Sequence, residues 1–193
     1  TGAGGFIGRA LVEELAQSGY RVFAVLRRPP PKWEWKDKSV EVVCRPLSQI
    51  AELEHLIPDR DIDLFFHLAW EGTAGEGRAN SRLQLQNIQW AIDCVEVAAN
   101  MGCSRVVCSG SICEQEVLAA LDTPGTALPP DSLYGSAKLT AHCMCSAVAG
   151  SRGIPLLWPV ITNAYGEGEK SPRLINGSIR AMLRGDFSPA PYA

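Results

Sequence analysis

The stretch TGAGGFIG at residues 1–8 decides the fold, because it places Gly2, Gly5 and Gly8 directly in front of a helical pattern. Glycines at this spacing let the backbone approach a pyrophosphate at a helix N-terminus, where unpaired N–H groups and the helix dipole favour negative charge. A turn of this kind needs a strand before it. We therefore expect at least one short apolar strand on the N-terminal side of Thr1, so that the printed chain lacks the first strand of its sheet.

Helical and strand-like segments alternate along the rest of the chain. Apolar residues at helical spacing predict a helix in RALVEELAQSG (9–19), and buried apolar runs predict strands. The further expected elements are strands at 20–26, 40–44 and 63–69, a helix at 48–57, a helix at 78–101, a strand at 105–110, a loop at 123–130, a helix at 133–148, a strand at 154–161 and a helix near 172–183. This alternation predicts the doubly wound α/β class, a parallel sheet with helices on both faces.

Composition and charge exclude several classes of protein. With 193 residues, 46% hydrophobic and 20% charged, the chain is typical of a globular domain with a sizeable core. Its net charge of −3 offers no basic field, so we expect no nucleic-acid partner. No apolar run approaches the roughly 20 residues of a membrane span, and no signal peptide stands at Thr1, so we expect a cytoplasmic protein without a membrane partner. The seven cysteines include no CxxC pair, and we expect reduced thiols and no metal site.

The segment YGSAK at 134–138 carries the clearest chemical signal. It places Tyr134 and Lys138 four residues apart on a predicted helix, and therefore on one face. A tyrosine ordinarily has a pKa of about 10, but an adjacent ammonium favours the phenolate and lowers that pKa. Such a tyrosine can exchange a proton with a carbinol or a carbonyl at neutral pH. Together with the glycine turn, the pair predicts an acid–base site beside a bound dinucleotide.

The end of the strand at 20–26 bears on which dinucleotide is bound. An acid there would hold the ribose 2′-hydroxyl of NAD, whereas this chain has Arg27 and Arg28, which suit the 2′-phosphate of NADP. The alternative is two exposed arginines without such a role. We therefore expect NADP or NAD as the cofactor, with NADP favoured by Arg27.

Six segments, in order along the chain, carry a resemblance to a known family: TGAGGFIG, HLAW (67–70), Asn87 in the long helix, SGS (109–111), YGSAK and NAYG (163–166). The set resembles the extended short-chain dehydrogenase/reductases, specifically the NAD-dependent epimerase/dehydratase family that acts on nucleotide sugars. The resemblance implies a Rossmann domain at 1–166, without its first strand, and the incomplete start of a substrate-binding domain at 167–193. It also implies a nucleotide-sugar substrate and a homodimer formed through the helices at 78–101 and 133–150.

The same resemblance implies roles for individual residues. Tyr134 would be the acid and base, Lys138 would bind the nicotinamide ribose and tune that tyrosine, and Ser111 would hydrogen-bond the substrate oxygen. The other expected cofactor contacts are Gly2, Gly5, Phe6, Ile7, Gly8, Arg27, Arg28, Leu68, Ala69, Trp70, Asn87 and Ser109. The other expected substrate contacts are Cys113, Asn163, Arg173 and Leu174.

Departures from the family's pattern reduce the number of candidate reactions. Pro46 stands where an acid-containing stretch would hold the adenine amine, and Trp70 replaces a small residue. Ile112 and Cys113 stand where the 4,6-dehydratases carry Asp-Glu, which disfavours dehydration. The remaining alternatives are a 4-epimerase that recycles bound NAD, a keto-sugar reductase that consumes NADPH, and a catalytically idle NADP-binding regulatory protein. We expect Cys113 to fill space beside the nicotinamide rather than to exchange a proton.

Overall fold

The computed structural model describes residues 1–29, 35, 37–57, 62–169 and 174–185. The chain forms two compact units, Thr1–Thr162 and Asn163–Ala193. The second unit contains one helix in its described part, α6 (Leu174–Leu183). The expected boundary after residue 166 and the substrate-binding role of the second unit stay predictions.

The strands of the first unit all pair in parallel, which confirms the α/β class expected from the alternation. They are β1 (Val22–Leu26), β2 (Val40–Cys44), β3 (Leu64–His67), β4 (Arg105–Cys108), β5 (Gly110–Ser111), β6 (Leu156–Leu157) and β7 (Val160–Ile161). β1 pairs with β2, β3 with β4 and β4 with β6, and β5 pairs with β7. The carboxyl ends of β1 and β3 therefore lead into the loops where a doubly wound sheet binds its ligand.

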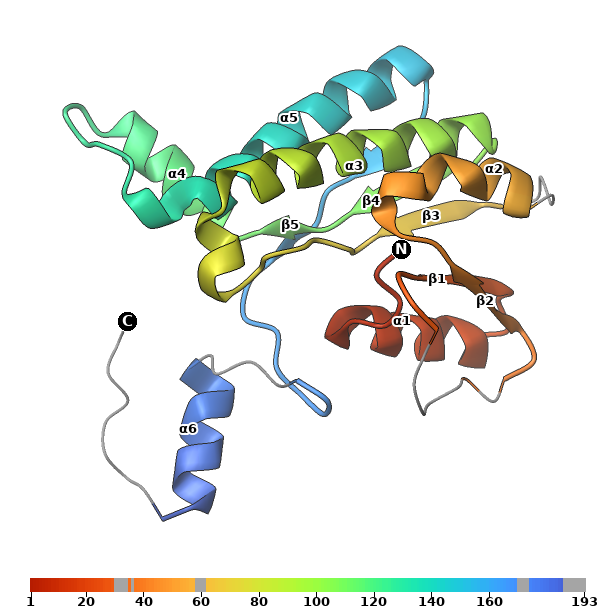
Figure 1. The fold of residues 1–193 in the computed structure, drawn as a ribbon, viewed down its shortest axis with the longest axis horizontal. Coiled ribbons are helices and arrows are strands. Elements are labelled where there is room, and N and C mark those ends of the chain that lie inside the picture. The colour runs from red at the N-terminus through yellow and green to blue at the C-terminus, as the bar shows by residue number, and fades with distance from the viewer. Residues whose placement is uncertain (30–34, 36, 58–61, 170–173, 186–193) are drawn as a thin grey trace. The chain divides into compact units, whose positions relative to one another are not determined.

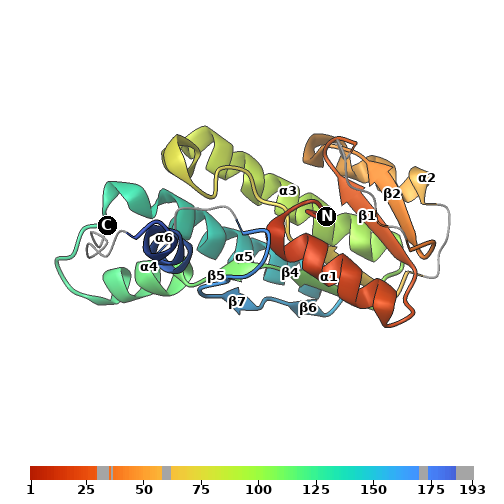
Figure 2. The ribbon, with the colours of Figure 1, turned by 90° about the horizontal axis from the view of Figure 1, so that it is seen from below.

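Helices cover both faces of these strands. They are α1 (Phe6–Gln17), α2 (Leu53–Leu56), α3 (Ser81–Asn100), α4 (Cys113–Asp122) and α5 (Leu133–Arg152), with 3₁₀ turns η1 (Leu47–Glu52), η2 (Gly75–Ala79) and η3 (Pro130–Ser132). α3 and α5 lie side by side over one face, and α1 lies against the other (Figures 1 and 2). The main core lies under α3 and α5 and includes Cys94, Val95, Val106, Cys108 and Cys145, all fully buried.

The helix expected at 48–57 is divided into η1 and α2, and the strand expected at 105–110 into β4 and β5. Two other segments differ more from the expected elements. α4 was not expected, because its segment has little apolar periodicity: Val117 is buried while Leu118 and Leu121 are exposed. The strand expected at 154–161 is two short strands, β6 and β7. Pro159 lies between them and has no N–H to donate, so the chain passes from its pairing with β4 to a new pairing with β5.

A groove of about 240 Å³ is lined by residues of α1, β1 and β3, most of them apolar. Thr1 runs along the β3 side of this groove. Its amino group donates to the carbonyl of Phe66, and its own carbonyl accepts from the N–H of Leu68. A strand before Thr1 stays a prediction.

None of the helices in the described ranges combines the length and the apolar character that a membrane span requires.

Candidate functional site

The glycine turn forms one wall of a pocket of about 620 Å³ at the N-terminal end of α1. Gly2 has a φ of 78°, and a Cβ there would lie 2.6 Å from the backbone nitrogen of Ala69. A Cβ on Gly8 would lie 2.1 Å from the carbonyl oxygen of Gly2. The turn is therefore packed so closely that side chains are excluded. The resulting cradle of backbone at a helix N-terminus fits a dinucleotide pyrophosphate.

The pocket brings together many of the expected cofactor contacts. Those that line it are Gly2, Gly5, Arg27, Arg28, Leu68, Ala69 and Trp70. Phe6 and Ile7 begin α1 without lining the pocket, and Gly8 packs behind the turn. These residues come from the first turn of α1 and from the ends of β1 and β3, so parallel strand ends assemble the site, as the fold class predicts.

Three arginines lie around the β1 side of the pocket: Arg27, Arg28 and Arg45. Arg27 pairs with Glu71, which also lines the pocket, at 2.8 Å between Nη1 and Oε1. Arg45 donates through Nε to Glu52 at 2.9 Å. Sequence reasoning missed Arg45 and Glu71. A signal existed for Arg45, because it directly follows β2, the strand beside β1.

Tyr134 and Lys138 lie one turn apart on α5, and both side chains are buried. The Lys138 Nζ donates to the carbonyl of Ser109 at 2.8 Å and lies 3.9 Å from the centroid of the Trp70 ring. The Trp70 ring meets the Tyr134 ring edge-on at 6.2 Å between centroids. Burial lowers the pKa of Lys138 to about 8, and the Glu114 carboxylate opposes that change. The unexpected Trp70 thus covers the ammonium.

Arg78 connects Tyr134 with the segment after β5. Its guanidinium carbon lies 4.5 Å from the centroid of the Tyr134 ring, and its Nη2 is 3.1 Å from Cys113 Sγ. The backbone N–H of Cys113 donates to Ser111 Oγ at 3.3 Å. The structure therefore brings Ser111, Cys113 and Tyr134 into one cluster. Sequence reasoning missed Arg78, since no pattern in GEGRAN (75–80) marks it.

Two amides from α3 hold the loop that follows β3. Asn87 accepts from the N–H of Glu71 and donates to the Glu71 carbonyl, both at 2.9 Å. Gln84 accepts from Trp70 Nε1 at 2.9 Å and donates to the carbonyls of Gly72 and Gly77. Both amides are buried. The structure thus places Asn87 behind the pocket wall, where it fixes the loop, and its expected contact with the cofactor stays a prediction.

The remaining expected residues lie elsewhere. Ser109 is buried at the end of β4 and contributes its carbonyl to Lys138. Asn163 and Leu174 belong to the second unit, and Arg173 lies outside the described residues. Their contacts with substrate stay predictions.

Known proteins resemble this chain in sequence and in structure. A ceramide reductase from Caulobacter vibrioides is 42% identical over 69 residues, which are 36% of this chain and 21% of that protein. The structure of MoeE5 in complex with UDP-glucose and NAD matches 96% of this chain and 60% of its own, with 29% identity and a TM-score of 0.71. DesIV, a dTDP-glucose 4,6-dehydratase from Streptomyces venezuelae solved with NAD, matches 95% of this chain and 61% of its own, with 20% identity and a TM-score of 0.74.

These matches cover about 60% of each solved structure, so the chain spans only part of the length of those proteins. They confirm a Rossmann-like arrangement of parallel strands and helices. The model of the NAD dependent epimerase/dehydratase family matches residues 1–192, nearly the whole chain. The glycine cradle, the parallel strand ends around it and the family match over residues 1–192 lead to one conclusion: the chain belongs to the NAD-dependent epimerase/dehydratase family.

Proposed function

We propose that this chain provides the dinucleotide-binding and proton-transfer residues of an NAD(P)-dependent nucleotide-sugar epimerase. The observation that carries the proposal is the pair of buried side chains, Tyr134 and Lys138, on one face of α5. Both contact the ring of Trp70, which lines the same pocket as Gly2. A nicotinamide dinucleotide held in that cradle would supply hydride transfer. MoeE5 was solved with UDP-glucose and with UDP-glucuronic acid, each time with NAD, which supports a nucleotide sugar as the substrate class.

The side chains divide the proton chemistry among them. The Tyr134 hydroxyl gives a proton to the sugar oxygen or takes one from it, and the Lys138 ammonium favours the phenolate form. The Arg78 guanidinium over the tyrosine ring adds a second positive charge that acts in the same direction. The Ser111 hydroxyl orients the substrate oxygen. We also propose a cytoplasmic homodimer formed through α3 and α5, whose exposed faces carry Leu85 and Met144.

An assay with a panel of nucleotide sugars tests the reaction. The purified protein is incubated with UDP-, GDP- and dTDP-sugars, and the products are separated by chromatography. An epimerase converts one sugar into its epimer with no net change in the cofactor. Net consumption of NADPH would establish the reductase instead, and cofactor binding without conversion of any sugar would establish the idle regulator.

A keto-sugar reductase is the second candidate, favoured by the arginines at the end of β1. Arg27 and Arg28 line the pocket where a 2′-phosphate would lie. The similarity to a ceramide reductase, which extends over 69 residues, also supports a reductase. Dehydration is not proposed, because the acid nearest to Ser111, Glu114, is buried with its carboxylate bonded to the protein's own N–H groups.

We predict that NADP binds about 10-fold or more tightly than NAD, and that Arg27→Gln removes most of this preference. A charge-assisted bond to phosphate contributes about 1.5 to 3 kcal/mol, and 1.4 kcal/mol is a factor of 10 in affinity. Arg27 must exchange Glu71 for the phosphate, which costs little because both side chains are exposed. Calorimetric titration with the two dinucleotides measures the preference.

Arg152→Gln is the matched control for this prediction. Arg152 lies in the last turn of α5, bonds to Asn100 and does not line the pocket. The control should keep the wild-type ratio of affinities. Equal or reversed affinities in the wild-type protein would remove the 2′-phosphate interpretation and favour bound NAD.

We predict that Cys113→Ser preserves most of the activity. A serine hydroxyl is close to a thiol in size and can accept from Arg78 as the sulfur does. Turnover in deuterated water, followed by mass spectrometry, is expected to place no deuterium on the carbons beside the keto group. Enzyme-dependent deuterium uptake that disappears in the serine variant would instead make Cys113 a proton-exchange group and the protein an epimerase-reductase.

A further inference from the structure

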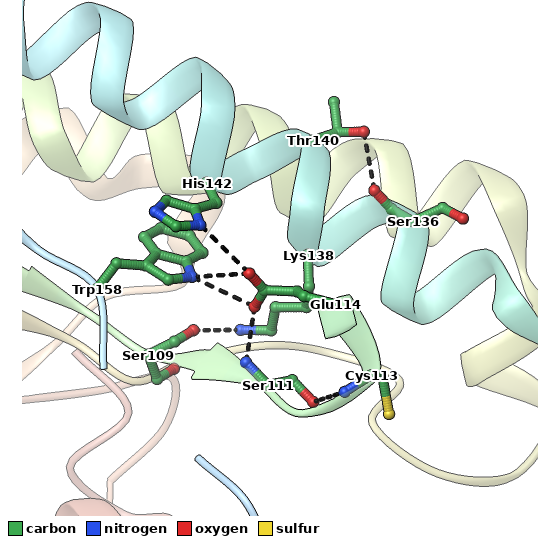
Figure 3. Close-up of polar contacts among 9 residues, drawn as sticks. All are labelled: Ser109, Ser111, Cys113, Glu114, Ser136, Lys138, Thr140, His142 and Trp158. Carbon is green, nitrogen blue, oxygen red and sulfur yellow. Dashed lines mark hydrogen bonds and ion pairs between the residues drawn. The ribbon is translucent and has the colours of Figure 1, made fainter. Parts of the chain in front are cut away.

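Glu114 is a buried carboxylate in the first turn of α4, and only 1% of the residue is exposed. Its Oε1 accepts from the backbone N–H of Ser111 at 2.7 Å. The indole Nε1 of Trp158 donates to both carboxylate oxygens, at 3.2 and 3.1 Å. His142 Nδ1 lies 3.4 Å from Oε2, and its ring stacks on Trp158 (Figure 3). An acid on a short helix is thus turned into the protein rather than toward water.

Glu114 binds the main chain of residues 109–111 at Ser111, and Lys138 binds the same stretch at Ser109. Its Nζ donates to the carbonyl of Ser109, two residues before the N–H that Glu114 accepts from. Figure 3 shows the two side chains meeting the segment 109–111 together. A buried cation and a buried anion therefore hold the short stretch of main chain that carries Ser111. Burying both charges is costly unless each is compensated by the other and by hydrogen bonds.

We propose that Glu114 is a positioning residue of this site: its carboxylate keeps the Lys138 ammonium charged and holds the main chain that presents Ser111. The effect of Glu114 on catalysis rests on the proposed function, whereas the effect of Glu114 on the charge of Lys138 does not.

The other titratable groups around Lys138 supply no such charge. Burial raises the pKa of the Cys108 thiol strongly and that of Cys145 to about 12, so both are neutral at ordinary pH. Burial also holds the pKa of His67 well below its usual range, which leaves that ring neutral. Tyr134 lies one turn away on α5, and it carries no charge while its phenol holds its proton. In the part of the chain that the structure describes, Glu114 is thus the carboxylate that opposes the burial of Lys138.

Removal of the Glu114 charge is expected to lower the pKa of Lys138, because burial and that charge act on it in opposite directions. Burial lowers the pKa of Lys138 and the Glu114 charge raises it, with a balance at about 8. Removing the negative charge leaves burial unopposed, so the pKa must fall further. Lys138 then loses its proton near neutral pH and no longer favours the Tyr134 phenolate.

Glu114→Gln tests the proposal directly, because it keeps the size of the side chain and an oxygen for the N–H of Ser111. The titration of Lys138 is followed by NMR in protein labelled with ¹³C-lysine; the chain has five lysines, Lys32, Lys36, Lys38, Lys138 and Lys170. We expect the midpoint of Lys138 to fall by at least about one pH unit. Glu116→Gln, an exposed acid in the same turn of α4, is the matched control and should leave the midpoint unchanged.

The pH profile of turnover provides the second readout. In Glu114→Gln the alkaline decline of kcat should move to lower pH by the same interval, with little change in KM. At about pH 8 this is a loss of about 5-fold, which approaches about 10-fold at higher pH and is largely recovered well below the new midpoint. A purely structural role would instead lower kcat at every pH. Glu114→Asp, which keeps the charge, should hold the midpoint above that of the glutamine variant.

A wild-type midpoint for Lys138 in Glu114→Gln overturns the inference. If that variant does not fold, Glu114→Met, which also lacks the charge, is titrated in its place under the same criterion. A lowered midpoint in a protein that turns over no nucleotide sugar supports the charge coupling and rejects the proposed function. The two failures are therefore distinguishable.

Discussion

Tyr134→Phe is expected to lower kcat by about 10² to 10⁴-fold while the affinity for the dinucleotide changes little. The substitution removes only the hydroxyl that moves the proton. The ring itself remains, with its edge against Trp70 and its face under the Arg78 guanidinium. Steady-state turnover and calorimetric titration with the dinucleotide measure the two quantities separately.

Tyr20→Phe is the control for this experiment, because Tyr20 is exposed and lies just before β1, far along the sequence from YGSAK. It should leave turnover unchanged. Wild-type turnover in Tyr134→Phe on the true substrate would show that another group moves the proton, and the catalytic assignment would be wrong.

Gly8→Ala is expected to lower the free energy of unfolding by about 1 to 3 kcal/mol or more, and to weaken dinucleotide binding with it. The added Cβ would lie 2.1 Å from the Gly2 carbonyl oxygen and 2.9 Å from the Ala3 Cα. These neighbours are backbone atoms, so relief requires the glycine turn itself to move. Denaturation by urea gives the stability, and titration with NADP gives the affinity.

Gly150→Ala makes the same chemical change in another helix with the opposite expected sign. A Cβ at Gly150 in α5 meets nothing within 4 Å. Alanine is favoured over glycine in a helix by about 0.5 to 1 kcal/mol, so this variant should be more stable than wild type. If Gly8→Ala matched it in stability and in NADP affinity, the tight cradle would not be needed for binding.

Local patterns predicted the elements in which the positions expected to face the core are the ones that are buried. The apolar run VFAVL became β1 with Ala24, Val25 and Leu26 buried, and the four-residue spacing of Tyr134 and Lys138 placed both side chains on the buried face of α5. The helix α4 could not be predicted in this way. Glu114 is buried there while Leu118 and Leu121 are exposed, which inverts the usual apolar pattern. Its inward face is explained by the N–H of Ser111 together with a partner far along the chain, Trp158.

The contacts that Arg78 and Glu71 make within the site could not be predicted from the sequence for a related reason. Arg78 reaches Tyr134 and Cys113 across separations of 56 and 35 residues, and nothing near Arg78 in the sequence marks either contact. Glu71 pairs with Arg27 across 44 residues. Motifs indicate which groups carry the chemistry, whereas the charges that surround them depend on how distant segments fold together.

The loop after β3 is fastened through its main chain, since Gln84 and Asn87 bond to backbone atoms of Glu71, Gly72 and Gly77. The conformation of the loop therefore does not depend on its exposed side chains, Thr73, Ala74 and Glu76. Mutations at these positions, which follow the pocket-lining Gly72, can accumulate through evolutionary drift while the backbone of the loop keeps its hydrogen bonds. A library randomised at these three positions is the laboratory counterpart of that drift.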